Sequence, residues 1–266
     1  MLRVRPIHFT SRLDAWERLL TDLGLVKTVD EPTWREFDAG AGRLAIHLAE
    51  AGSAEDGTTT LGVEVGDLKE FARRTKEAGA ADSTTAAGTN AELVDADHGP
   101  SCRVTAADGY SFLADPATRA SDGSWGGSAD ADPGLAVVGV WFSEDAVAAA
   151  RTLRDIGALP RPVPGSGAAI TDTDMNADAD TAESETFTAK NGGVLMLGTS
   201  PAGGQAGLGF EYAGDLNALR DRLTEAGYEA AVIEEAGVPT LHVANPDSEG
   251  VASRRPLWIS AAPALG

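Results

Sequence analysis

Apolar residues recur at helical spacing in four segments of the chain. In the first, the stretch from Trp16 to Leu23 is apolar at i, i+3, i+4 and i+7, and Gly24 stands where a helix ends. Ser11 provides a start that resembles a capping box. The other three predicted helices begin at Asp67, near Ser143 and at Asp215, and they end at Gly79, Gly157 and Gly227.

After each predicted helix the pattern changes toward a period of two, in short segments broken by Gly, Asp or Pro. Such segments are typical of strands, and Asp108-Gly109 between two of them is a hairpin signal. The predicted strands are 33–37 and 43–48, 102–105 and 110–113, 185–188 and 194–197, and 240–243 and 257–259. Each helix therefore belongs to a β-α-β-β module, with room for a third strand after the helix.

The two halves of the chain also resemble each other. The stretch Leu61–Leu68 recurs as Leu208–Leu216, an offset of 208 − 61 = 147 that becomes 148 after one inserted residue. Glu-Ala-Gly follows both copies, at 77–79 and 225–227. This repetition indicates a duplication. We predict a first domain over 1–118, a linker rich in Gly, Ser, Asp and Ala over 119–133, and a second domain over 134–262.

These modules resemble the vicinal oxygen chelate superfamily, which includes glyoxalases and bleomycin-resistance proteins. The resemblance rests on Asp22-Leu23-Gly24-Leu25, on the Gly42–Leu48 strand, on the strand and helix over Glu64–Gly79, and on Ala107–Pro116. It implies an α+β fold of tandem domains. Each domain would pair two βαβββ modules in a cupped, mostly antiparallel sheet with its helices outside.

In metal-dependent members of this superfamily, the ligands come from the first and last strands of each module. The resemblance places these positions at Val4, His47, Leu61 and Leu113 in the first domain. In the second domain it places them at Met196 and within 138–140 and 257–259. Hydrocarbon side chains have no lone pair to donate. We therefore expect no complete metal site and no cofactor.

His8 shares strand parity with Val4, so we expect it to face the same cup as His47. Trp34 could add an aromatic wall to this cup. We predict that His8, Trp34 and His47 contact a small organic ligand without a metal, in a protein resembling the bleomycin-resistance branch. Two other classes stay open. One is a lyase, isomerase or dioxygenase that uses a divalent metal held in part by His47, and the other is a noncatalytic structural or dimerisation protein.

Several other residues are expected to have structural roles. His98 is predicted to be an exposed turn residue, and Trp16 a core residue. Glu64 and Glu211 fall on the opposite strand face from Leu61, where we expect them to face solvent or a dimer partner. The acidic segment 172–185 matches calcium-loop positions from Asp172 to Glu183, but Ala177 occupies the glycine position, so we expect an acidic insertion instead.

The net charge of the chain limits the kinds of partner that we expect it to bind. The chain has 21 Lys and Arg against 41 Asp and Glu, a net charge of −20. Such a surface repels phosphate backbones and anionic lipids, so neither nucleic acid nor a membrane is an expected partner. One cysteine cannot form an internal disulfide, and no stretch is long and apolar enough to cross a bilayer. We expect a cytoplasmic monomer or homodimer.

Overall fold

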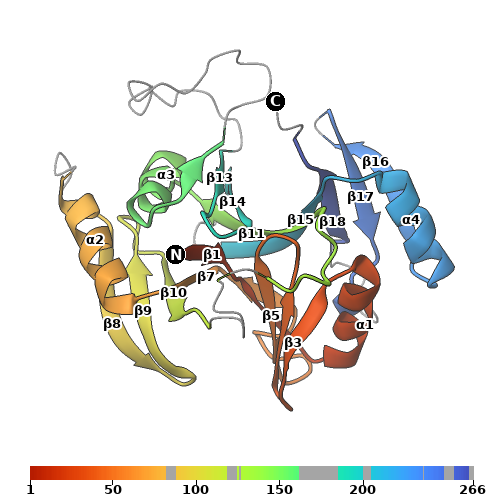
Figure 1. Cartoon of the computed structure of the whole chain (residues 1–266), viewed down its shortest axis with the longest axis horizontal. Helices are drawn as coiled ribbons and strands as arrows, with labels where there is room; N and C mark the ends of the chain where they lie inside the picture. Colours follow the sequence, from red (N-terminus) through yellow and green to blue (C-terminus); the bar gives the residue numbers. More distant parts are fainter. Residues whose placement is uncertain are drawn as a thin grey trace.

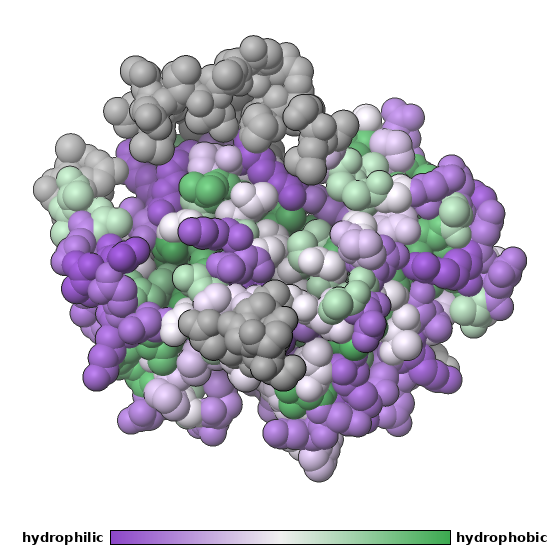
Figure 2. Space-filling model, in the orientation of Figure 1, coloured by the Kyte–Doolittle hydropathy of each residue, from purple (hydrophilic) through white to green (hydrophobic). Residues whose placement is uncertain are grey.

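The computed structural model describes residues 1–81, 88–118, 125, 127–161, 185–199, 205–235, 237–248 and 255–263. The calcium-like pattern Asp172–Glu183 lies outside these ranges. None of the described helices is both long and apolar enough to span a bilayer. On the face shown in Figure 2, hydrophilic residues predominate, and apolar residues form small separate areas.

The first half of the chain forms two βαβββ modules. The first strand of each module is interrupted once, so each contributes two short strands before its helix. Module 1 comprises β1 (Leu2–Val4), β2 (Ile7–Thr10), α1 (Leu13–Leu23), β3 (Val26–Asp30), β4 (Trp34–Asp38) and β5 (Arg43–Leu48). Module 2 comprises β6 (Thr58–Thr60), β7 (Gly62–Val65), α2 (Leu68–Ala81), β8 (Asn90–Ala96), β9 (Gly99–Thr105) and β10 (Ser111–Pro116).

The second half repeats this order. Module 3 comprises β11 (Leu135–Ser143), α3 (Ala146–Asp155), β12 (Leu159–Pro160), β13 (Thr186–Thr188) and β14 (Val194–Thr199). Module 4 comprises β15 (Gln205–Tyr212), α4 (Leu216–Glu225), β16 (Ala230–Glu235), β17 (Val238–Val243), the 3-10 turn η2 (Pro246–Ser248) and β18 (Leu257–Ala261). The predicted α+β class and the four βαβββ modules are confirmed.

One pairing rule builds the sheets. In each module the first strand pairs in parallel with the last, as β2 with β5, β7 with β10, β11 with β14 and β15 with β18. The first strands of neighbouring modules then pair antiparallel, β1 with β7 and β11 with β15. The strands form a five-stranded sheet, β1-β7-β10-β9-β8, and a thirteen-stranded sheet. The larger sheet joins β2, β3, β4, β5 and β6 to the strands of the second half, where Ala206 of β15 pairs with Thr59 of β6.

The helices pack across the two halves. Helix α1 contacts α4, and α2 contacts α3, on opposite sides of the molecule (Figure 1). One hydrophobic cluster combines residues of modules 1 and 4, including Leu20, Phe37, Phe210 and Ile259. Another combines residues of modules 2 and 3, including Val63 and Trp141. Both hydrophobic clusters thus draw residues from either side of the predicted boundary between residues 118 and 134.

Most of the predicted helix ends are present. The carboxylates of Asp145 and Asp215 accept backbone N–H bonds at the starts of α3 and α4. Gly24 ends α1 in the left-handed conformation (φ 97°), which glycine adopts at little cost. Two details differ. Helix α1 begins after Arg12, because Ser11 bonds to Asp56 instead of capping the helix.

Helix α2 also continues through Gly79 to Ala81 instead of stopping there. Gly79 is needed for close packing. A Cβ atom at this position would lie 2.3 Å from the carbonyl oxygen of Thr89 and 2.8 Å from its amide nitrogen. Backbone atoms cannot rotate away from such a contact, so glycine lets the helix lie directly on the chain that enters β8.

The described part of the predicted linker is bound to the first half. The amide of Ser128 donates to Asp38 at 2.9 Å, and the amide of Asp132 donates to the carbonyl of Gly24 at 2.9 Å. Arg222 of α4 lies 3.8 Å from the Asp132 carboxylate. Residues 127–133 therefore follow the surface of the first half instead of forming a free tether.

Gly79→Ala should lower the free energy of unfolding by about 1–3 kcal/mol, the usual range for overpacking a tight contact. Urea denaturation followed by circular dichroism measures this change. Ala80→Ser, at the exposed next position of the same helix, is the matched control and should have little effect. Equal stabilities of Gly79→Ala and the wild type would contradict the close approach of α2 to Thr89.

Candidate functional site

The two faces of the first-half sheet differ in chemistry. The outer face packs on the helices and carries Leu2, Val4 and Val63, all in a hydrophobic cluster. The inner face is the opposite one. It carries Arg3 of β1 and Arg5, which directly follows β1; both alternate with the outer-face residues and are almost fully buried.

A charged cluster occupies the inner face. Arg3 pairs with Glu64, and Arg43 lies 2.6 Å from Asp38, 3.0 Å from Glu36 and 3.2 Å from Glu64. This cluster consists of Arg3, Arg5, Arg43, Glu36, Asp38, Glu64 and Asp115, which come from β1, β4, β5, β7 and β10. Strand pairing in both modules is therefore needed to assemble it.

Mutual neutralisation makes this burial possible. An unpaired charge in such a place would be very costly, whereas each guanidinium here faces two or more carboxylates. Burial alone would lower the pKa of Arg43. The hydrogen bond to Asp38 and the charges of Glu64, Asp38 and Glu36 outweigh it, so the pKa is raised above its ordinary value. The cluster is therefore a buried network of ion pairs, which we call the ionic floor.

Aromatic side chains lie beside this floor. Trp34 is partly buried and donates from Nε1 to Glu36 at 3.2 Å, while the Arg5 guanidinium lies 5.4 Å from its ring centre. The ring of His47 meets Trp34 edge to face at 5.8 Å. The ring of His98 is nearly parallel to Trp34, with an interplanar angle of 15° and a centroid distance of 6.3 Å. We call Trp34, His47 and His98 the aromatic rim.

Asp115 connects the rim to the charged cluster. Its carboxylate pairs with Arg5, and it accepts hydrogen bonds from Ser101 at 2.6 Å and from Nε2 of His98 at 2.9 Å. Since a carboxylate only accepts, Nε2 of His98 carries the proton. His98 comes from the turn between β8 and β9, and Trp34 comes from β4. The rim therefore brings modules 1 and 2 together.

The sequence predictions are only partly realised at this site. Trp34 and His47 do lie together, because they are direct partners in the β4–β5 register. His8 does not join them. It is paired with Ile46, whose side chain belongs to the outer-face cluster. The prediction that His8 and His47 face one cup is therefore wrong. Val4 and Leu61 likewise lie in a buried hydrophobic cluster, beside Gly139 of the second half.

His8 instead belongs to a buried polar group under α1. Its Nε2 lies 2.8 Å from Asp247 of η2, and its Nδ1 lies 3.0 Å from the hydroxyl of Thr59. Thr10 and the indole of Trp16 also donate to Asp247, at 2.5 and 3.0 Å. Burial acts to raise the pKa of Asp247. These hydrogen bonds and the His8 charge outweigh burial, and the pKa is lowered. Trp16 is a core residue, as predicted.

One other prediction needs correction. Glu64 and Glu211 do lie opposite the apolar residues, but both are buried and neither faces solvent. Glu64 belongs to the charged cluster, and Glu211 accepts from Arg161 at 2.7 Å. His98 is partly exposed, as expected of a turn, but it also reaches Asp115 and Trp34.

A signal for this arrangement was present in the sequence. Arg3 and Arg5, and likewise Glu36 and Asp38, stand two residues apart on their strands. Such spacing places each pair on one face. In the structure, Arg3 is the register partner of Glu64 on β7, and Asp38 is the register partner of Arg43 on β5.

The inner face of the second half is mostly apolar, and the ion pair of the buried Glu211 with Arg161 also lies on it. Val138, Val140 and Val194 are buried there, with Phe142, Met196 and Trp258 packed against them. Glycines make room for the rings, since a Cβ at Gly209 would lie 2.2 Å from Trp258. The duplicated sheets therefore have inner faces of opposite character.

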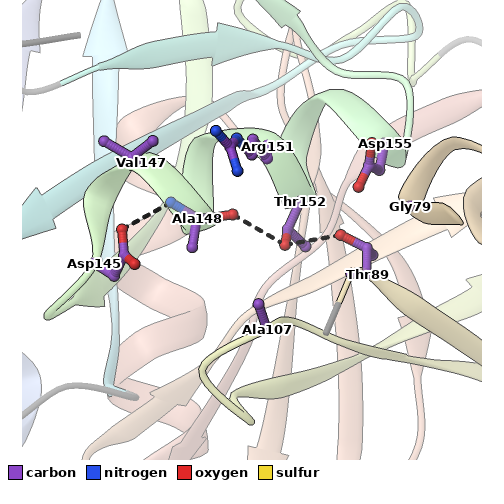
Figure 3. A pocket seen from close by; sticks show the side chains of 10 residues that line it. Gly79, Thr89, Ala107, Asp145, Val147, Ala148, Arg151, Thr152 and Asp155 are labelled. Atoms are coloured by element: carbon purple, nitrogen blue, oxygen red, sulfur yellow. Dashed lines mark hydrogen bonds between the residues drawn. The ribbon is translucent and has the colours of Figure 1, made fainter. Parts of the chain in front are cut away.

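One cavity of about 340 Å³ lies between α2 and α3 (Figure 3). A hydrogen bond between Thr89 and Thr152 crosses its wall, and Asp145 on its lining caps α3. The lining also includes Gly79, Ala107, Val147 and Arg151, and it contains no aromatic residue. It lies between helices and is separate from the aromatic rim.

Comparison with solved structures identifies the architecture. A catechol 2,3-dioxygenase superposes over 100% of this chain and 91% of its own, with a TM-score of 0.58 and 16% identity. The 2,3-dioxygenase LapB from Pseudomonas sp. KL28 gives 98% and 91%, with a TM-score of 0.58 and 10% identity. The Mn(II)-bound glyoxalase from Novosphingobium aromaticivorans gives 97% and 80%, with a TM-score of 0.56 and 11% identity.

This chain has the vicinal oxygen chelate fold. No protein-family model and no curated protein matches the sequence. At 10–16% identity the structural likeness establishes the fold and leaves the activity open.

Metal ligands expected of the vicinal oxygen chelate fold do not assemble here. Among the described residues, no three or more His, Cys, Asp and Glu side chains are grouped so that they could hold a metal ion. The inner-face carboxylates of the first half are engaged by arginines. The inner face of the second half presents Val138, Val140, Met196 and Trp258. These residues do not fit a resident divalent metal.

The charged cluster should be intolerant of losing one partner. Glu64→Gln removes the charge of the carboxylate that pairs with Arg3 and lies 3.2 Å from Arg43, and we expect it to lower the free energy of unfolding by about 3–5 kcal/mol. The double variant Arg3→Met/Glu64→Leu, which removes charges of both signs, should recover part of this loss. Guanidinium denaturation measures both effects.

Arg73→Ala is the matched control for the cluster, because Arg73 forms exposed ion pairs with Glu70 and Glu77 on α2. It should change stability far less than Glu64→Gln. Similar effects of the two variants would show that the inner-face charges are not energetically buried.

Asp247→Asn tests the buried group around His8. The folded pKa of Asp247 is lowered, so its charge stabilises the fold above about pH 4 and this contribution is lost as pH falls through the folded pKa. The variant should be about 1.5–3 kcal/mol less stable at pH 7. The difference should narrow below pH 4. Urea unfolding at several pH values measures it, with Asp95→Asn on exposed β8 as control, and a difference independent of pH would contradict the assignment.

Proposed function

We propose that this protein binds a small organic molecule on the inner face of its first half, at the aromatic rim, without a metal ion. The observation that carries the proposal is the convergence of Trp34, His47 and His98 beside a buried ionic floor. The rim side chains are partly exposed, whereas the cluster below them is sealed. A ligand could therefore reach the rings without disturbing the arginine pairs.

Aromatic faces suit planar ligands, because stacking adds to the burial of apolar area. The rim also supplies directional polar contacts. Nδ1 of His47 is buried, and no described residue hydrogen-bonds to it. A buried N–H without an acceptor is costly, so the neutral ring is expected to carry its proton on Nε2.

The proposed contact set differs from the one expected from sequence. Trp34 and His47 stay in it. His8 leaves it because its ring is engaged by Asp247 and Thr59 on the other sheet face. His98 was not in the expected set, and its ring stacks on Trp34.

The absence of a metal is part of the proposal. It is supported by the apolar residues at the inner face of the second half and by the paired carboxylates of the first. Lyase, isomerase or dioxygenase chemistry with a divalent metal would need ligands that the described residues do not bring together. No described feature favours that alternative.

Thermal-shift screening of the purified protein with a panel of planar organic compounds tests the function. We expect at least one compound to raise the melting temperature and to bind in isothermal titration. His47→Ala should weaken that binding by about tenfold, the value of one aromatic ring contact of about 1.4 kcal/mol. His242→Ala is the matched control, because His242 pairs with Glu235 in the second half.

Three results would overturn the proposal. The first is that no compound of the panel binds. The second is that His47→Ala and Trp34→Ala both bind a panel compound with unchanged affinity. The third is that protein purified without chelators contains stoichiometric divalent metal. Metal analysis by mass spectrometry addresses the last result directly.

A further inference from the structure

The charged cluster is one positive charge short of neutrality. It contains three guanidinium groups, Arg3, Arg5 and Arg43, and four carboxylates, Glu36, Asp38, Glu64 and Asp115. Two carboxylates, Glu36 and Asp38, lie within 3.0 Å of Arg43. Asp115 is the member of the cluster that also contacts the rim, through His98 and Ser101. The uncompensated charge can therefore be met from the rim side.

In this structure, His98 contacts the Asp115 carboxylate from a partly exposed position. Its side chain is 39% exposed, whereas that of Asp115 is 6% exposed. The ring lies nearly parallel to Trp34 and donates Nε2–H to Asp115. In chemical terms, His98 presents a small planar ring with an N–H donor to an aromatic face and a carboxylate. These are the contacts that a bound molecule would make.

The side chain of His98 can also rotate away from Asp115 and Trp34. A partly exposed side chain can change rotamer without moving the sheet. The neighbouring turn is open as well, since Gly99 has φ 119° and nothing lies within 4 Å of where its Cβ would be. Rotation of His98 would uncover the Asp115 carboxylate and the part of Trp34 that it stacks on. Arg5 and Ser101 would keep Asp115 in place.

We propose that His98 occupies the ligand position of the aromatic rim and that the ligand replacing it is a planar cation with N–H donors, such as an amidine or a protonated nitrogen heterocycle. This inference rests on the proposed function and specifies its ligand class. Planarity follows from Trp34, the N–H donors from Asp115, and the positive charge from the deficit of the cluster. A cation at this place compensates a buried carboxylate, whereas an anion would add to the excess of negative charge.

The variant His98→Ala removes the imidazole ring from this position. Three planar probes of similar size and shape then test the effect of ligand charge. Benzamidine is planar and cationic, benzamide is planar and neutral, and benzoate is planar and anionic. Isothermal titration should show benzamidine binding His98→Ala at least tenfold more tightly than it binds the wild type, because the probe no longer competes with the histidine. Benzamidine should also bind the variant at least tenfold more tightly than benzamide does, and benzoate should not bind.

Two further variants locate the effect. Asp115→Asn in the His98→Ala background should remove the preference for benzamidine over benzamide, and His242→Ala should leave wild-type binding unchanged. Should Asp115→Asn fail to fold, the three-probe series in His98→Ala still decides, because it leaves the charged cluster intact. Equal affinity for the three probes, a preference for benzoate, or no gain over the wild type overturns the inference.

The two proposals fail in distinguishable ways. If a panel compound binds the wild type and depends on Trp34 and His47, but His98→Ala shows no preference for benzamidine, the binding function stands and the ligand class is wrong. If neither the wild type nor His98→Ala binds any compound, the binding function itself is wrong.

Discussion

Mutual neutralisation of buried charge is the constraint that shapes the first half of this protein. Arginines from the first strand can face inward only because β4, β7 and β10 bring carboxylates to the same place. A shift of one residue in any of these strands would move the charges to the hydrophobic face and the valines to the ionic floor. The register of the sheet and the identity of the inner face are therefore fixed together. The positions of the rim residues also depend on that register, in which Trp34 is the direct partner of His47.

The sequence allowed the architecture to be predicted because its signals are local and repeated. Helical spacing from Trp16 to Leu23, acidic caps at Asp145 and Asp215, and the glycines after the helices all act within a few residues. The duplicated Leu-Gly-x-Glu segments then related one half to the other. These features do not depend on knowing which elements meet in space, so the four modules could be recognised.

The site was harder to predict because it depends on which sheet face the helices cover. Alternation correctly separated Val4 from Arg3 and Glu64 from Val63. It could not say which set faces inward, and an apolar cup was the simpler expectation. The partner of His8 is Asp247, which lies 239 residues away in sequence. His98 stacks on Trp34 from the other module. Contacts between residues so far apart in sequence leave no periodic signal. Only the charged cluster had a signal in the sequence, in the spacing of its residues on β1 and β4.

The hydrophobic clusters shared between the halves have a consequence for how the chain matures. Leu20 and Phe37 pack with Phe210 and Ile259, which are translated only after the first half. While the first half leaves the ribosome, the outer face of its sheet beside α1 has no covering layer. Molecular chaperones that recognise apolar segments would meet that surface before α4 arrives. The order of synthesis thus leaves the module 1 side of this cluster uncovered until module 4 has been translated.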